Sequence, residues 1–203
     1  MSESNNPKQR SRNRSQTEAR LLDAAEKVFA QHGYDGASVR DVAAEAEANT
    51  SLINRYFGSK DGLLLGITER FIETKRHADM PYPLQPTLTD EIYHYLHHRL
   101  VEDRAQEAMV RLMVSRVSID DDYRQRAQTM MASGADENFK LRIKQHQAMG
   151  SAPDDINIDM LFSAIAYFSF SVNFFGAIVE RRPNEEIDAQ FSEFAHRMGA
   201  VRR

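Results

Sequence analysis

The chain has 203 residues, of which 41% are hydrophobic and 28% charged, with nine Gly, six Pro and no Cys. This composition is typical of a globular protein with a sizeable core, and it excludes disulfides, thiolate nucleophiles and Cys-ligated metal centres. The net charge of −4 argues against a nucleic-acid partner only as an average, because residues 1–60 carry a net +1 and residues 61–203 a net −5. Charges act over about 8–10 Å in salt solution, so the local excess of positive charge decides DNA binding more than the net charge of the whole chain does.

The first 16 residues are predicted to form a disordered basic arm. Residues 2–16 hold no large apolar side chain, so they cannot bury enough surface to offset the entropy lost on ordering. No apolar segment of the kind found in secretory signals follows them, and we expect a cytoplasmic protein.

Apolar residues recur at helical spacing from Ser15 to about residue 80, and cap residues divide this stretch into four helices. The motif Ser15-Gln-Thr-Glu18 is a capping box that predicts the start of the first helix, and Gly33 predicts its left-handed end. The next three helices are predicted at residues 38–46, 50–57 and 59–79.

Three prolines, Pro81, Pro83 and Pro86, interrupt the helical pattern and predict a boundary between domains at 17–80 and 81–203. No alternating Val/Ile/Thr run with hairpin signals occurs. The predicted fold class is therefore all-α. The later helices are expected at about residues 87–102, 104–117, 120–147 with a break near Ser133–Gly134, 155–182 and 185–198.

The two short helices 38–46 and 50–57, joined by a three-residue turn, match the helix-turn-helix plan. In that plan the second helix enters the major groove of DNA and presents its N-terminal residues to base edges. Two packed helices of an ordinary bundle show the same pattern and remain an alternative. The outward polar side chains that could contact bases or phosphates are Asn49, Thr50, Ser51, Asn54 and Arg55.

Phosphates could meet the chain at helix N-termini, where backbone N–H groups are free. Such N-termini are predicted at Ser38, Thr50 and Lys60, and the Lys60 ammonium adds a positive charge. The arginines of the N-terminal arm could follow the minor groove or the backbone, and they are Arg10, Arg12 and Arg14.

Three stretches resemble the tetracycline-repressor (TetR) family: residues 17–34 its first helix, residues 37–43 its second, and residues 51–64 its recognition helix and the start of its fourth. The resemblance implies a homodimeric transcriptional regulator, usually a repressor, with an N-terminal helix-turn-helix domain and a C-terminal domain for effector binding and dimerisation. Such a regulator binds a pseudo-palindromic double-stranded DNA operator and is released by a small-molecule effector. The family's phosphate contacts would fall on Ser38, Tyr56 and Lys60, and its base contacts on Thr50, Ser51, Asn54 and Arg55.

Two residues depart from the family pattern. Glu47 stands in the turn where the family usually has Gly, and a non-glycine residue disfavours left-handed geometry there. Asn54 stands in the recognition helix where the family usually has Tyr, which should change the bases that are read.

The second domain is rich in Met and Phe, which suit a pocket for a small hydrophobic or aromatic effector. For any single residue, ordinary core packing is the more frequent explanation. The candidate pocket residues are Met109, Met113, Met130, Phe162, Phe170 and Phe174.

The last two helices are predicted to form the homodimer interface, since helix 155–182 is apolar on two faces and helix 185–198 carries one apolar stripe. The uncharged run 160–179 is long enough to span a bilayer, but its serines and single occurrence favour a buried helix. The expected interface residues are Phe168, Val172, Phe175, Phe191, Phe194 and Met198.

The sequence offers one possible metal site and leaves an enzyme activity as an alternative function. Glu91, His94, His98 and Glu102 share one helical face with metal-ligand spacing, but a solvated polar face is favoured, and we expect no metal and no cofactor. No phosphate loop, dinucleotide fingerprint, HExxH or GxSxG motif occurs. An enzyme, or a DNA-binding architectural protein without a ligand, therefore remains only an alternative.

Overall fold

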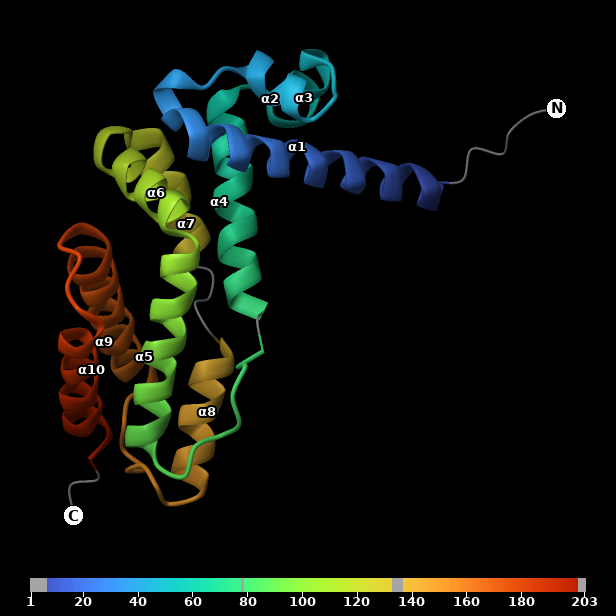
Figure 1. The fold of residues 1–203 in the computed structure, drawn as a ribbon. Coiled ribbons are helices and arrows are strands. Elements are labelled where there is room, and N and C mark those ends of the chain that lie inside the picture. Colours follow the sequence, from blue (N-terminus) through green and yellow to red (C-terminus); the bar gives the residue numbers. More distant parts are fainter. Residues whose placement is uncertain (1–6, 78, 133–136, 201–203) are drawn as a thin grey trace. The chain divides into compact units, whose positions relative to one another are not determined.

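The computed structural model describes residues 7–77, 79–132 and 137–200, and the regular structure in these ranges is helical throughout (Figure 1). The predicted all-α fold class is confirmed, while the break expected near Ser133–Gly134 lies outside the described residues. The helices are α1 Pro7–Gly36, α2 Val39–Glu45, α3 Thr50–Phe57, α4 Lys60–His77, α5 Leu88–Ala105, α6 Glu107–Ile119, α7 Asp121–Ala132, α8 Glu137–Ala148, α9 Ile158–Phe170, the π-helical η1 Ser171–Val179 and α10 Asn184–Gly199.

The chain divides into two compact units, each built from two separate stretches. Unit 1 contains Met1–Glu73 and Arg111–Ser133, and unit 2 contains Thr74–Val110 and Gly134–Arg203. Helix α4 therefore begins in unit 1 and ends in unit 2, and α6 does the reverse. This division differs from the predicted boundary at residue 80, because prolines only interrupt the helical pattern, whereas α7 packs into the first core.

Helix α1 begins at Pro7, so residues 7–16 of the expected disordered arm are helical in the structure. Proline suits the first turn of a helix, where its missing N–H is not needed. Arg14 Nε donates to Glu18 Oε1 at 2.9 Å and thereby occupies the carboxylate that a capping box at Ser15 would need. The predicted start at Ser15 is wrong. The predicted end is confirmed as a break within α1, because Gly33 has non-helical backbone angles with a φ of 68°, and a short turn of helix follows it to Gly36.

Helices α1 and α4 supply most of the apolar core of unit 1. Tyr123 of α7 closes this core, and its hydroxyl lies 2.7 Å from the hydroxyl of Thr68, with both side chains buried. At the surface, Arg70 of α4 forms ion pairs with Asp23 and Glu26 of α1, each at 2.7 Å. The buried apolar side chains contributed by α1 and α4 include Leu21, Ala25, Phe29, Leu63, Leu64 and Ile67.

Helix α5 is the central helix of unit 2, where it contacts α8, α9, η1 and α10 (Figure 1). Tyr95 of α5 stacks on Phe139 of α8, with ring centroids 3.9 Å apart. Each fully buried side chain of this size contributes about 1.5–3 kcal/mol to folding. The fully buried core residues include Leu88, Ile92, Leu96, Phe139, Ile165 and Phe191.

The expectation of a solvated polar face on α5 is wrong at Glu91, which is fully buried. Its carboxylate accepts hydrogen bonds from Arg142 of α8 and from the backbone N–H of Gln85, each at 2.8 Å. A carboxylate can be buried here because these charged and backbone donors replace water. No group of three or more potential metal ligands occurs in the part of the chain that the structure describes.

One nearly buried carboxylate in unit 2 binds two cations. Asp103 of α5 lies 2.6 Å from Lys75 Nζ and 3.4 Å from Arg99 Nη2, and it accepts a third hydrogen bond from Asn173 Nδ2 at 2.9 Å. Burial alone would raise the pKa of Asp103, but the charges of Arg99 and Lys75 outweigh burial and hold this pKa below its usual range. Burial and the adjacent Arg99 charge lower the pKa of Lys75, because the two cations share one carboxylate.

Replacing Asp103 with Ala should lower the free energy of unfolding by about 3–5 kcal/mol at pH 7, because it leaves Lys75 and Arg99 without this shared counter-charge. A carboxyl whose pKa is lowered by folding stabilises the protein above its unfolded pKa of about 4, and that contribution is lost as the pH falls through the folded pKa. Urea unfolding at pH 7 and at about pH 3 measures both effects.

The stability difference between wild type and Asp103→Ala should therefore shrink at the lower pH. The exposed Asp155→Ala in the same unit serves as the matched control and should change stability by less than about 0.5 kcal/mol. An equal difference for Asp103→Ala at both pH values would contradict the ion-pair account.

Candidate nucleic-acid interface

A capping box fixes the start of α2. Ser38 Oγ accepts the backbone N–H of Asp41 at 3.2 Å, and the Asp41 carboxylate accepts the backbone N–H of Ser38 at 2.9 Å. Hydrogen bonds from the Ser38 hydroxyl and N–H hold the pKa of Asp41 below its usual range. The predicted N-cap is confirmed, and its hydroxyl is already hydrogen-bonded within the helix start.

The turn between α2 and α3 contains a left-handed residue. Glu47 has a φ of 47°, a region that residues other than glycine seldom occupy. The Glu47 N–H donates to the Ala44 carbonyl at 3.1 Å, and the Ala48 N–H donates to the Ala43 carbonyl at 2.8 Å. The turn therefore keeps the conformation expected for glycine, and the glutamate bears the backbone strain.

Helix α3 turns its apolar side inward and its polar side outward, as the sequence pattern indicates. Ile53 is fully buried in unit 1. Asn49 has a role that the pattern did not indicate, because its side-chain oxygen accepts the Ser51 N–H at 2.8 Å and caps α3. The polar residues of α3 that are exposed or partly exposed are Thr50, Ser51, Asn54 and Arg55.

The first turns of α1 bring positive charge to α3. The guanidinium carbon of Arg14 lies 5.6 Å from the centre of the Tyr56 ring, and that of Arg55 lies 5.9 Å from it. These distances are within the range of cation–π attraction. Arg12 is exposed, whereas the side chain of Arg10 lies outside the described residues.

Lys60 is held by the protein itself. Its ammonium donates to the carbonyls of Tyr34 at 2.8 Å and Ala37 at 3.1 Å, and it lies 4.3 Å from the centre of the Tyr34 ring. Two of its three donors are thus used for the connection between α1 and α2. Its contacts assign Lys60 a positioning role, and only the third donor is left for the phosphate contact that the resemblance implies.

A cluster around Tyr34 joins α1, α4 and α6 within unit 1, and sequence reasoning missed it. The Tyr34 hydroxyl donates to the Asp61 carboxylate, and burial together with this hydrogen bond raises the pKa of Tyr34. The Arg116 guanidinium lies 4.4 Å from the centre of the same ring and 3.5 Å from Asp61. The three residues are far apart in sequence, so no local spacing could have linked them.

The six candidate pocket residues are divided between the two units. Phe162 is a core residue beside Phe139, with ring centroids 6.4 Å apart, so its aromatic ring serves packing. Phe170 and Phe174 stack on each other with centroids 5.5 Å apart, and Phe170 is 45% exposed. The three methionines are partly buried, with Met109 in unit 2 and Met113 and Met130 in unit 1.

The predicted dimer stripe faces mostly inward. Phe191 and Val172 are buried in the core of unit 2, so they are unavailable to a partner. Phe168 stacks on Phe194 with ring centroids 3.8 Å apart, and Met198 packs against the same core. Phe175 is the member of the expected set that is largely exposed. Both faces of α9 and η1 are apolar, and the spacing alone does not say which face packs internally, so the dimer interface stays a prediction.

Part of the surface of α9 and η1 is apolar and exposed. The segment Ile158–Val179 is long and apolar enough to span a membrane by length and composition. An 18-residue window of it has a mean hydropathy of 1.6, and 44% of that window is buried inside the protein. The large apolar side chains exposed along it, from 45% to 77%, are Met160, Tyr167, Phe170, Phe175 and Val179.

Comparisons with known proteins include a match to the part of the chain that contains α2 and α3. Residues 21–67 match the family model described as bacterial regulatory proteins, tetR family. The HTH-type transcriptional repressor SCO4008 of Streptomyces coelicolor is 34% identical over 97 residues, which are 48% of this chain and 47% of that protein. The repressor NicS of Pseudomonas putida is 28% identical and covers 77% of this chain and 76% of its own length. The match to SCO4008 thus spans about half of that relative's length.

The fold also resembles solved structures. FadR from Bacillus subtilis in complex with stearoyl-CoA superimposes with a TM-score of 0.66, covering 91% of this chain and 99% of that chain. Its sequence identity of 14% supports likeness of fold alone. The match covers the helix-turn-helix elements and the later helices together.

Glu47→Gly should raise the free energy of unfolding by about 0.5–1 kcal/mol, because glycine adopts a φ of 47° without the clash of a Cβ atom. The matched control Glu47→Gln removes the charge but keeps the strain, and it should leave stability within about 0.5 kcal/mol of wild type. Thermal or urea unfolding of the three proteins checks this. Equal stabilisation by both variants would show that charge, rather than backbone strain, sets the cost.

Proposed function

This chain belongs to the tetR family of bacterial regulatory proteins, and we propose that it is a transcriptional repressor that binds a double-stranded DNA operator as a homodimer and is released by a small-molecule effector. The observation that carries the proposal is the pair α2 and α3, with polar side chains exposed on α3 and an apolar side fixed in the core of unit 1. Such a helix fits the major groove.

Base reading is assigned to the exposed polar face of α3. Asn54 can pair with an adenine edge and Arg55 with a guanine edge, each through two hydrogen bonds. Thr50 and Ser51 lie at the N-terminus of the helix, where a hydroxyl can reach a base or a phosphate. Asn49 is reserved for capping α3, so its contribution to DNA recognition is the orientation of that helix.

Phosphate binding is assigned to residues around α3 and to the start of α1. Arg12 and Arg14 lie on a helix whose first turns are beside Tyr56, so their charges are presented on an ordered segment. An ordered cation pays less entropy on binding than one on a flexible tail. Ser38 and Tyr56 complete this set at the edges of the helix pair.

The homodimer is assigned to the exposed apolar stripe of Met160, Tyr167, Phe170, Phe175 and Val179. Contiguous exposed apolar surface on a soluble chain marks a contact site. Two copies of such a stripe can pair about a two-fold axis, because each presents the same surface to the other. The dimer would place two α3 helices in successive major grooves of a pseudo-palindromic operator.

The effector-binding site is assigned to unit 2, because the resemblance to the family implies effector binding in the C-terminal domain. The solved complex of FadR with stearoyl-CoA shows that a fold of this kind can hold a ligand with a long apolar acyl chain. We propose a small hydrophobic or aromatic effector, with Phe174, whose ring stacks on that of Phe170, as its candidate contact. A coupling of about 1–3 kcal/mol between effector and operator would give a 5- to 150-fold loss of DNA affinity.

Selection of bound fragments from genomic DNA tests the proposal and supplies the operator. On that operator, Arg55→Ala should weaken binding by about 1–3 kcal/mol and relax the preference at one base pair. Arg126→Ala is the matched control, because Arg126 is an exposed arginine of unit 1 that lies on α7 and pairs with Asp122 of the same helix. No enriched fragment, or equal losses for the two variants, would contradict base reading by α3.

Replacing Tyr167 with Glu should convert the dimer to a monomer at micromolar concentration, because it places a charge at the centre of an apolar contact. Leu141→Glu is the matched control, since Leu141 is 53% exposed on α8 and lies outside the stripe. Sedimentation velocity distinguishes the two variants. A wild-type monomer, or a Tyr167→Glu dimer, would remove the stripe as the interface.

A further inference from the structure

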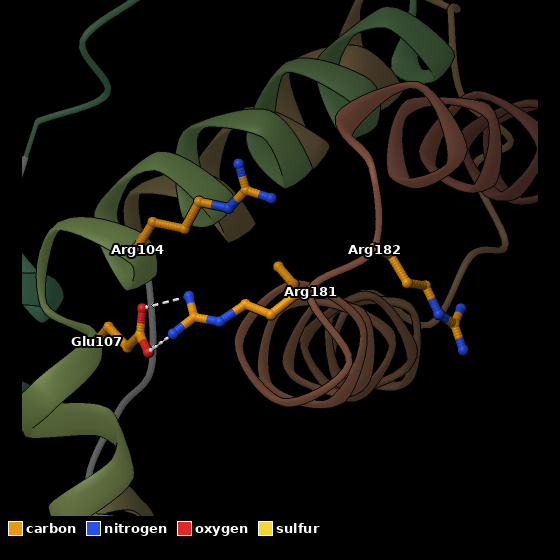
Figure 2. Close-up of a pocket in the computed structure, with 5 residues that line it drawn as sticks. Arg104, Glu107, Arg181 and Arg182 are labelled. Carbon is orange, nitrogen blue, oxygen red and sulfur yellow. Dashed lines mark hydrogen bonds and ion pairs between the residues drawn. The ribbon is translucent and has the colours of Figure 1, made fainter.

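A hollow of about 230 Å³ lies in unit 2, between the end of α5, the start of α6 and the segment that includes and follows the end of η1 (Figure 2). Three of its five lining residues are arginines and one is a carboxylate. This volume is below that of a typical drug-sized pocket, so it suits a small ligand or one polar group of a larger ligand. Its lining consists of Arg104, Glu107, Ala177, Arg181 and Arg182.

Arg181 and Glu107 form a two-pronged ion pair across this hollow. Arg181 Nη1 donates to Glu107 Oε2 at 2.9 Å, and Nη2 donates to Oε1 at 2.7 Å (Figure 2). This planar geometry is the one by which a guanidinium binds any carboxylate or phosphate. The Arg181 side chain is 64% exposed, so solvent and solutes reach it. Glu107 thus occupies a position that an external oxyanion could take.

The backbone at Arg181 is strained in a way that points its side chain into the hollow. Its φ is 58°, a left-handed value that is costly for any residue with a Cβ atom. The neighbours on each side hold it there, because the Glu180 N–H donates to the Phe175 carbonyl at 2.8 Å and the Arg182 N–H donates to the Gly176 carbonyl at 2.9 Å. Strained residues that are fixed by their surroundings cluster at ligand-binding sites.

The second cation that faces the hollow is Arg104, which comes from α5. Its Nη1 donates to Asn184 Oδ1 at 2.6 Å, a neutral partner that leaves the positive charge of Arg104 uncompensated by that contact. Arg182, by contrast, pairs with Glu180 and Glu186, and its side chain points away from Glu107 (Figure 2). Two cations, Arg104 and Arg181, are therefore available to an anion in the hollow, and Glu107 supplies one opposing negative charge.

We propose that this hollow is an oxyanion-binding site, in which Arg181 and Arg104 bind a carboxylate or phosphate group of a small molecule and Glu107 is the internal competitor that the group displaces. The site is distinct from the apolar surfaces that the proposed effector contact uses. It stands whether or not the chain binds DNA, because its test measures binding of small anions to the intact protein.

Isothermal titration calorimetry of the full chain with succinate and with inorganic phosphate, at constant ionic strength, tests the proposal. Arg181→Gln should weaken binding at least about tenfold, because it removes the guanidinium fork. Glu107→Gln should strengthen binding by about fivefold or more, because it removes the competing carboxylate. Arg197→Gln, an exposed arginine paired with Glu193 on α10, is the matched control and should leave affinity unchanged.

The opposite signs of the two changes separate a binding site from a structural ion pair. A purely structural pair predicts that both Arg181→Gln and Glu107→Gln only lower the melting temperature, with no anion binding to the wild type, and that result overturns the proposal. If Arg181→Gln fails to fold, Arg181→Gly replaces it, since glycine suits the backbone at that position. Tighter binding of succinate would identify a carboxylate ligand, and tighter binding of phosphate a phosphorylated one.

Discussion

The position of α3 depends on a core that α3 itself does not contain. Helices of seven and eight residues are too short to persist alone in water, so α2 and α3 exist because α1 and α4 offer them an apolar surface. Ile53 enters that core, and the polar clasp of Lys60 on the carbonyls of Tyr34 and Ala37 fixes the connection that precedes α2. A rigid support of this kind is what allows a few exposed side chains to read DNA edges.

In unit 2, as in unit 1, helices pack one face in the core and leave another face exposed. The inner faces of α9, η1 and α10 pack on α5, and the outer face of α9 and η1 stays apolar and uncovered within the chain. A nine-residue π-helix is unusual, and π-helical turns often occur at functional sites. Here Asn173 of η1 donates a hydrogen bond to Asp103, and η1 ends two residues before the strained Arg181. This irregular helix therefore contributes to the internal ion network and leads into the proposed anion site.

The sequence predicts those features of the fold that depend on residues close together in the chain. The cap at Ser38, the stop at Gly33 and the buried side of α3 follow from neighbouring residues, and each is confirmed. The start of α1 was missed because Arg14 claims the carboxylate of Glu18 that a capping box would need. Contacts between distant residues, such as Arg116 with Tyr34, and the choice between two apolar faces of η1, depend on tertiary packing that no spacing reveals.

In the proposed dimer, two α3 helices, each fixed by the core of its own unit 1, read two half-sites of the operator. Hydroxyl-radical footprinting of the full chain on a DNA fragment selected for binding tests this most directly. We predict two protected patches related by two-fold symmetry, with centres one helical turn or a whole multiple of it apart, about 34–36 Å per turn. A single protected patch, or protection without symmetry, would contradict the claim.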